Sequence, residues 1–142
     1  MLEILIVIGL FAIIGTFAMF IDMGSLFGNS FRGEERTIVT LLQNARADAM
    51  DNVGQAPHGL AIYPADNPDA YVLFAQSAYA TDPLSHRVVE EAYDIEISGA
   101  PVEIVFEQLS GNSNFEGTIT LTDPNRGITS EITINHEGAI SW

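Results

Sequence analysis

Three kinds of side chain in this sequence have types from which active sites are built: histidines, paired carboxylates, and clustered acidic or amide groups. The histidines are His58, His86 and His136, and each lies in or beside a segment of turn-forming residues. None of them belongs to a catalytic motif in which a nucleophile, a base and an orienting acid converge. We therefore expect turn or surface histidines and predict no catalytic residue.

Two pairs of carboxylates, Glu90 with Glu91 and Asp94 with Glu96, have the residue type that glycoside hydrolysis requires. Adjacent residues of a strand face opposite sides, so only Asp94 and Glu96 can share a face. A solvated strand face accounts for that pair. We therefore do not expect an enzyme, and an anchored hydrolase is the weakest of the alternatives.

Oxygen-rich clusters at Asp66, Asn67 and Asp69, and at Asp123 and Asn125, are the candidates for a metal site. Carboxylate and amide oxygens suit calcium, but neither cluster has the spacing of a twelve-residue calcium loop. Asx-type turns account for both clusters. We expect no cofactor, with calcium at Asp66, Asp69 or Asp123 as the weak alternative.

The elements that must position these residues begin with an apolar segment. No charged residue occurs from Ile4 to Ile21, and a helix of roughly 18 residues spans about 27 Å, close to the hydrocarbon thickness of a bilayer. No lysine or arginine precedes Arg32, so the basic leader of a signal peptide is missing. We expect a transmembrane or filament-core helix over residues 1–30.

Three residues of this segment bear on how the helix packs. Glu3 lies at the edge of a hydrocarbon-length helix, where a carboxylate costs free energy unless it reaches water or meets a partner. The residues alone leave both accounts open, a water-facing group or a partner in a neighbouring subunit. Gly9 and Gly15 allow neighbouring helices to approach closely.

A second helical pattern follows a break rich in glycine, serine and asparagine. Apolar residues then recur at three- and four-residue spacing, which predicts an amphipathic helix over 31–54 that ends near Asn52 to Gly54. Glu34 and Glu35 are expected at its N-terminus, where the helix dipole favours negative charge. We expect one long helix interrupted around Gly24 to Gly33, because each glycine destabilises a helix interior by about 1 kcal/mol.

Beyond Pro57 the apolar pattern changes to period two or to short runs between turn residues, which indicates strands. We expect a β-rich head over 55–142, with Trp142 covering the edge of its core. The fold class is α+β, with the long N-terminal helix packed on an antiparallel sheet or on a two-sheet head. The predicted strands are Gly59–Tyr63, Tyr71–Gln76, Val88–Tyr93, Ile95–Ser98, Val102–Gln108, Gly117–Thr122, Ser130–Asn135 and Ala139–Trp142.

The composition excludes several functions. The 19 acidic residues stand against five arginines and no lysine, which makes the net charge −14. Affinity for nucleic acid comes largely from neutralising phosphates with basic side chains, so we expect no nucleic-acid partner. The absence of cysteine excludes a disulfide-stapled domain, a cysteine-ligated zinc site and a thiol nucleophile.

The segment LEILIVIGLFAIIG, with one glutamate ahead of a long apolar run, resembles the N-terminus of the type IV pilin and type II secretion pseudopilin family. The segment GLAIYPADNPDAYVLFA and the ending Ile134 to Ile140 resemble the H-type minor pseudopilins and the related FimT-like pilins, which close with a Val-Asn-x-x-Gly-x-Val type of sequence. The family's helix-breaking proline is absent. In the family pattern about two more residues, usually an aromatic and a threonine or serine, would precede Met1, after the glycine at which prepilin peptidase cleaves.

This resemblance implies a structural minor pilin or pseudopilin subunit with no catalytic activity. In the family the glutamate pairs with the free, usually N-methylated, terminal amine of an adjacent subunit, which assigns that role in assembly to Glu3. The implied partners are other pilin-like subunits, which the N-terminal helix contacts, and prepilin peptidase. The implied location is the bacterial inner membrane, crossed once with the head outside the cytoplasm, and then a filament in the periplasm or at the cell surface.

Secretion, motility, adhesion and DNA uptake all stay open as roles within that family. The main alternative from another class is a membrane-anchored extracytoplasmic β-domain that binds a ligand such as a glycan or a metal. In that case the apolar helix is a plain tether.

Overall fold

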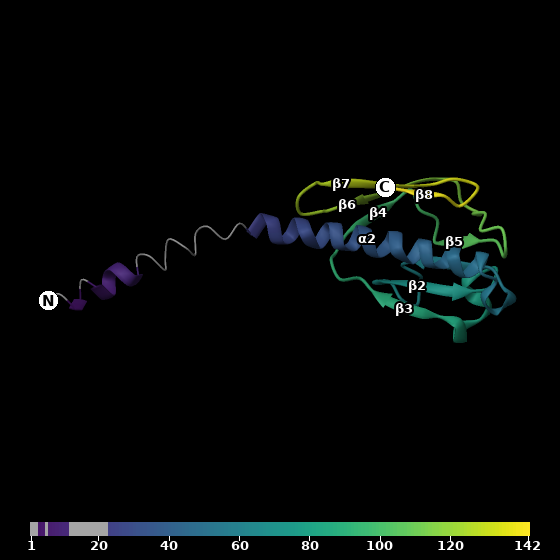
Figure 1. Ribbon diagram of the computed structural model, residues 1–142, viewed down its shortest axis with the longest axis horizontal. Coiled ribbons are helices and arrows are strands. Elements are labelled where there is room, and N and C mark those ends of the chain that lie inside the picture. Colours follow the sequence, from purple (N-terminus) through teal and green to yellow (C-terminus); the bar gives the residue numbers. More distant parts are fainter. Residues whose placement is uncertain (1–2, 5, 12–22) are drawn as a thin grey trace. The chain divides into compact units, whose positions relative to one another are not determined.

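Figure 1 shows the computed structural model of the chain, in which residues 3–4, 6–11 and 23–142 are described. The chain divides into two compact units, Met1–Ser30 and Phe31–Trp142. In the first unit residues 3–4 and 6–11 are helical. None of the described helices is both long and apolar enough to cross a bilayer. Gly15 and most of the predicted span from Ile4 to Ile21 lie outside the described residues.

Helix α2 (Met23–Met50) enters the second unit and forms its centre. From Phe31 onward its buried side chains recur every three or four residues, which is the pattern of an amphipathic helix. The chain leaves the helix through Asn52, which has a left-handed backbone (φ 58°), so the predicted end is confirmed to within a few residues.

The interruption expected around Gly24 to Gly33 is wrong, because α2 runs through these residues without a break. Glycine costs a helix only about 1 kcal/mol per residue. The burial of the apolar face further along α2 outweighs such a cost, because each buried large aliphatic side chain contributes about 1.5–3 kcal/mol.

Two antiparallel sheets make up the rest of the second unit. The first sheet has the order β3-β2-β1-β5 and the second the order β4-β6-β7-β8. The strands are β1 (His58–Ile62), β2 (Ala70–Ala75), β3 (Arg87–Glu90), β4 (Glu96–Ser98), β5 (Glu103–Phe106), β6 (Gly117–Thr122), β7 (Thr129–Ile134) and β8 (Ile140–Ser141). All eight predicted strands are confirmed within a few residues at their ends.

The core lies where α2 is packed between the two sheets (Figure 1). The helix contributes Phe31, Ile38, Leu42 and neighbours along the same stripe. The first sheet adds side chains from β1, β2 and β5, and the second adds Ile119, Leu121, Ile132 and Ile134 from β6 and β7. The two-sheet form of the predicted α+β class is therefore confirmed.

The opposite face of the first sheet is covered by a loop. Ala61, Val72, Phe74 and Val105 form a second, smaller cluster on that face, and Tyr79 packs against it. Tyr79 begins the short 3-10 helix η2 (Tyr79–Thr81), which a second one, η3 (Pro83–Ser85), follows. The rings of Tyr79 and Phe74 pack edge to face with centroids 5.8 Å apart.

Two predictions about single residues are wrong. Trp142 does not cover the core edge, because it is 61% exposed. Glu34 and Glu35 do not begin a helix, because α2 starts more than two turns earlier. Instead, Glu34 and Glu35 contact different parts of the head. The main-chain N–H of Ala92, just after β3, donates to Glu34, and the hydroxyl of Ser130 on β7 donates to Glu35.

Candidate functional site

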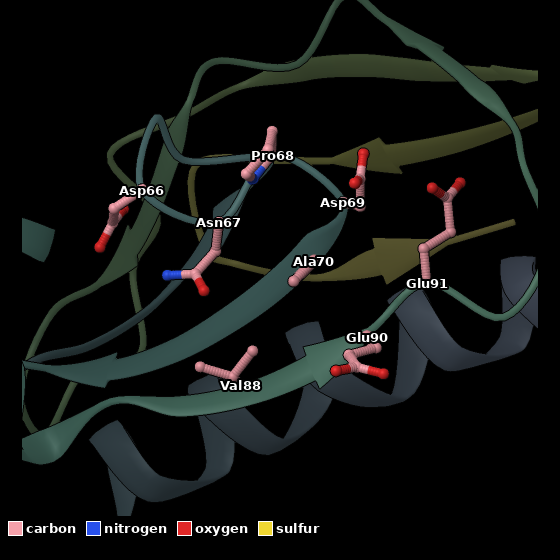
Figure 2. A pocket seen from close by; sticks show the side chains of 8 residues that line it. All are labelled: Asp66, Asn67, Pro68, Asp69, Ala70, Val88, Glu90 and Glu91. Atoms are coloured by element: carbon pink, nitrogen blue, oxygen red, sulfur yellow. The ribbon is translucent and has the colours of Figure 1, made fainter.

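A pocket with a volume of about 390 Å³ lies at one end of the first sheet (Figure 2). It forms there because β2 and β3 pair with Ala70 opposite Glu90, which brings the turn before β2 beside the end of β3. The lining residues are Asp66, Asn67, Pro68, Asp69, Ala70, Val88, Glu90 and Glu91. The structure thus brings together the calcium candidates Asp66 and Asp69 with the carboxylate pair Glu90 and Glu91.

Two of these four carboxylates already have partners in the fold. The Tyr79 hydroxyl donates to Asp66, whose two oxygens lie 2.8 and 2.9 Å away. Glu91 Oε1 accepts from the Tyr63 hydroxyl at 2.7 Å and from the main-chain N–H of Ile95 at 2.9 Å. In Figure 2 Asp66 and Glu91 lie at opposite ends of the pocket.

The pocket therefore concentrates negative charge without forming a metal cage. Over the described ranges, no three histidine or acidic side chains are grouped so that they could hold a metal ion. Glu90 is exposed on β3, and Asp69 is exposed in the turn. These two carboxylates give the pocket a solvent-accessible acidic rim.

Behind Glu91 lies a buried polar cluster that joins α2 to the first sheet. Glu34 is only 2% exposed, and its Oε2 accepts from the main-chain N–H of Ala92 at 3.3 Å. The rings of Tyr63 and Tyr71 stack with centroids 5.5 Å apart, and their hydroxyl oxygens are 3.3 Å apart. A chain of polar groups therefore runs from the pocket wall toward the helix.

The protonation of this cluster follows from its burial. Burial raises the pKa of Glu34, and the nearby charge of Glu91 raises it further, whereas the Tyr71 hydroxyl and the N–H groups of Ala92 and Tyr93 lower it in part. Burial also raises the pKa of Tyr63 and Tyr71 far above the usual phenol value. Both tyrosines therefore keep their protons and act as donors. Glu34 Oε1 is buried and has no hydrogen-bond partner within the described part of the chain.

The spacing of apolar residues around Glu34 predicts that this side chain is buried, although its assignment to a helix N-terminus led to a different expectation. Glu34 is three residues after Phe31 and four before Ile38, so it lies on the same apolar stripe of the helix. A carboxylate on such a stripe is expected to be buried or to find a partner. Tyr63 and Tyr71 gave no comparable signal, because tyrosine is common in strands.

The remaining candidates have structural contacts. Asp123 is fully buried; its Oδ1 accepts from the main-chain N–H groups of Asn125 and Arg126, as in an Asx-type turn, and its Oδ2 accepts from the Tyr93 hydroxyl. His58 and His86 each lie 2.9 Å from a main-chain carbonyl oxygen.

Two more candidates, Asp94 and His136, lie outside the acidic pocket. Asp94 precedes β4, which begins at Glu96, and His136 lies exposed in the last turn.

The first unit holds the assembly candidates. Glu3 is helical and exposed. At Gly9, beyond its chain neighbours and the backbone of its own helix, no atom of the described residues lies within 4 Å of the position that a Cβ would take. Among the residues of this unit whose side chains the structure describes, six large apolar ones are at least half exposed: Ile4, Ile6, Val7, Ile8, Leu10 and Phe11.

No protein-family model matches the chain, and no similar protein is found among curated proteins or solved structures. The fold defines the class as an α+β protein in which an N-terminal helix packs against antiparallel sheets.

Proposed function

We propose that this chain is a structural subunit of the type IV pilin or type II secretion pseudopilin class, closest in kind to the H-type minor pseudopilins. It assembles into a filament through its N-terminal helix. The exposed apolar residues between Ile4 and Phe11 carry this proposal. The sequence has no polar residue from Ile4 to Phe11, and a helix that is apolar all round is stable only in lipid or among other helices.

The difference in burial between the two parts of the chain supports the same proposal. The part of α2 from Phe31 onward is buried within the head, so the head needs no partner to cover that stripe. The described apolar side chains between Ile4 and Phe11, in contrast, are at least half exposed. A chain of this design can occupy a membrane first and a bundle of sister helices afterwards.

Glu3 is the residue through which the proposal is tested. In a bundle of apolar helices, a carboxylate is stabilised only by a partner of opposite charge, and the terminal amine of a neighbouring subunit provides one. We expect Glu3→Leu to leave the chain in the membrane fraction and to lower its content in sheared filaments at least tenfold. Glu131→Leu, a matched change at an exposed glutamate of β7, is the control and is expected to assemble normally.

Two results contradict the proposal. Normal incorporation of the Glu3→Leu variant into filaments removes the role assigned to this carboxylate. A full-length chain that stays monomeric in detergent, with no helical partner in native membranes, favours the other candidate function. That candidate is an anchored β-domain that binds a ligand, and the acidic pocket of Figure 2 is then the first place to look for the ligand.

A further inference from the structure

A second recess, distinct from the acidic pocket, lies between the side of α2 and strand β3 and has a volume of about 290 Å³. Leu41 of α2 and Val89 of β3 contribute its apolar surface. Its polar side chains include Arg36, Thr40 and Asn44 from the helix and Arg87 from the strand. We call this recess the arginine groove.

The arginine groove has the opposite charge to the molecule as a whole. The chain carries 19 acidic residues and only five arginines, yet two of those arginines line this groove and none of its lining residues is acidic. Arg36 and Arg87 are both exposed. A partner bearing carboxylates is therefore attracted here and repelled by most of the remaining surface.

Strand β3 separates the two charged surfaces. Successive residues of a strand face opposite sides, so Arg87 and Val89 face the groove, while Val88 and Glu90 line the acidic pocket seen in Figure 2. A strand placed beside β3 would meet arginine on one face. On its other face it would meet the half-exposed side chain of Val88 and the exposed carboxylate of Glu90, so the acidic side chains of the added strand must lie on the arginine face.

The open edge of β3 supplies the backbone groups for such a strand. In the described part of the chain β3 pairs only with β2 and ends the first sheet. The N–H of Glu91 donates to the carbonyl oxygen of Asp69. Hydrogen-bonded positions alternate along an antiparallel pair, so the backbone groups of Val89 and Arg87 also point toward β2. The N–H and C=O groups of Val88 and Glu90 then point outward, away from β2.

We propose that the edge of β3 together with the arginine groove binds an extended segment of an acidic partner protein, which adds to the first sheet as a fifth strand. Backbone hydrogen bonds to Val88 and Glu90 hold the segment in register. Its carboxylates meet Arg36 and Arg87 at alternate positions, and the side chains between them lie beside Val88. This site goes beyond the proposed role in assembly and does not depend on it.

The test uses the full-length chain in a mild detergent and a capped hexapeptide of alternating glutamate and valine. Amide hydrogen exchange is followed residue by residue by NMR. We expect added peptide to slow exchange at Val88 and Glu90, the two amides that point outward. A hexapeptide of alternating lysine and valine is expected to leave these rates unchanged.

Three variants separate strand addition from general charge attraction. Arg87→Glu replaces an attraction by a repulsion and is expected to weaken binding about tenfold. Arg126→Glu makes the same change of charge in the turn after β6 and is expected to change binding less than twofold. Val88→Pro removes one outward N–H at a sheet edge, where proline is tolerated, and is expected to abolish the slowed exchange. Arg87→Glu still decides the case if Val88→Pro does not fold.

Several outcomes overturn the proposal. Unchanged exchange at Val88 and Glu90 with saturating peptide excludes strand addition. Equal weakening by Arg87→Glu and Arg126→Glu reduces the effect to net charge. Slowing that appears without peptide and grows with protein concentration assigns the edge to a second copy of the chain. Displacement of the peptide by a single-stranded oligonucleotide at equal concentration assigns the groove to phosphates.

Discussion

Replacing Glu34 with glutamine is expected to stabilise the protein at neutral pH, because it removes the negative charge of a buried carboxylate. Glu34 is only 2% exposed, and one of its oxygens accepts a long hydrogen bond of 3.3 Å from Ala92. The other oxygen, Oε1, has no partner among the described residues. Glutamine keeps the acceptor for Ala92 and carries no charge that burial would penalise.

The expected gain follows from the cost of burying an ionised carboxylate whose second oxygen has no partner, because an unsatisfied buried group costs about 1–3 kcal/mol and a charged one more. Because the side chain of glutamine also has a buried donor to satisfy, we expect a net gain of about 1–2 kcal/mol at pH 7. In a domain of this size such a gain raises Tm by about 4–8 °C.

The gain depends on pH, and its sign is set by the raised pKa of Glu34. Because burial raises this pKa above its ordinary value of 4.5, the folded protein holds the proton more tightly than the unfolded chain. Below pH 4.5 both states are protonated, and the penalty is absent. As the pH rises above 4.5 the unfolded chain releases its proton first, so the wild-type protein loses stability relative to Glu34→Gln.

Thermal unfolding followed by far-UV circular dichroism between pH 4 and pH 8 measures this difference. Tryptophan fluorescence is a poor probe here, because Trp142 is 61% exposed. The control is Glu35→Gln at the neighbouring position, where the Ser130 hydroxyl donates to the carboxylate. We expect this control to lose about 1 kcal/mol or less, because one hydrogen bond is weakened.

The reasoning is refuted if Glu34→Gln is less stable than the wild-type protein at pH 7. It is also refuted if the difference between the two proteins stays constant from pH 4 to pH 8. Either result would mean that the ionised carboxylate gains more from its surroundings than burial costs it.

Three further substitutions test the turns that close the second sheet. Gly138→Ala would place a Cβ 2.1 Å from the carbonyl oxygen of Gly111 on a backbone with φ +72°, so we expect a loss of at least about 2 kcal/mol in the free energy of unfolding by urea. At Gly127 φ is +63°, but apart from its chain neighbours no atom of the described residues lies within 4 Å of the position that a Cβ would take. Gly127→Ala is therefore expected to cost about 1 kcal/mol, and an equal loss at both positions would contradict the steric argument. Asp123→Ala removes the acceptor for two main-chain N–H groups and one hydroxyl. We therefore expect a loss of about 2–4 kcal/mol in the free energy of unfolding by urea. A loss below about 1 kcal/mol would show that water replaces these bonds.

Most of the head could be predicted from local patterns. Each strand has apolar residues at period two or in short runs between turns, and this pattern survives in the fold because one face or both faces of each strand are buried. The register of β1 with both β2 and β5 was not predictable, since it depends on contacts between residues far apart in sequence. The position of Trp142 was missed for a related reason: a terminal aromatic residue carries no sign of which surface lies beneath it.

The candidate site was predictable only in its parts. Asp66 with Asp69, and Glu90 with Glu91, form separate clusters in the sequence, and only the pairing of β2 with β3 makes them one pocket. Likewise Arg36 and Arg87 are 51 positions apart in the sequence and meet at one groove because α2 crosses the first sheet.

The sequence by itself determined the α+β class, the eight strands and the apolar, glutamate-bearing N-terminus, because these depend on residue type and spacing along a short stretch of chain. The tertiary structure alone decided which side chains surround Glu34 and that β3 has acid on one face and arginine on the other. The surroundings of these residues depend on which distant segments pack against them, and no local pattern contains that information.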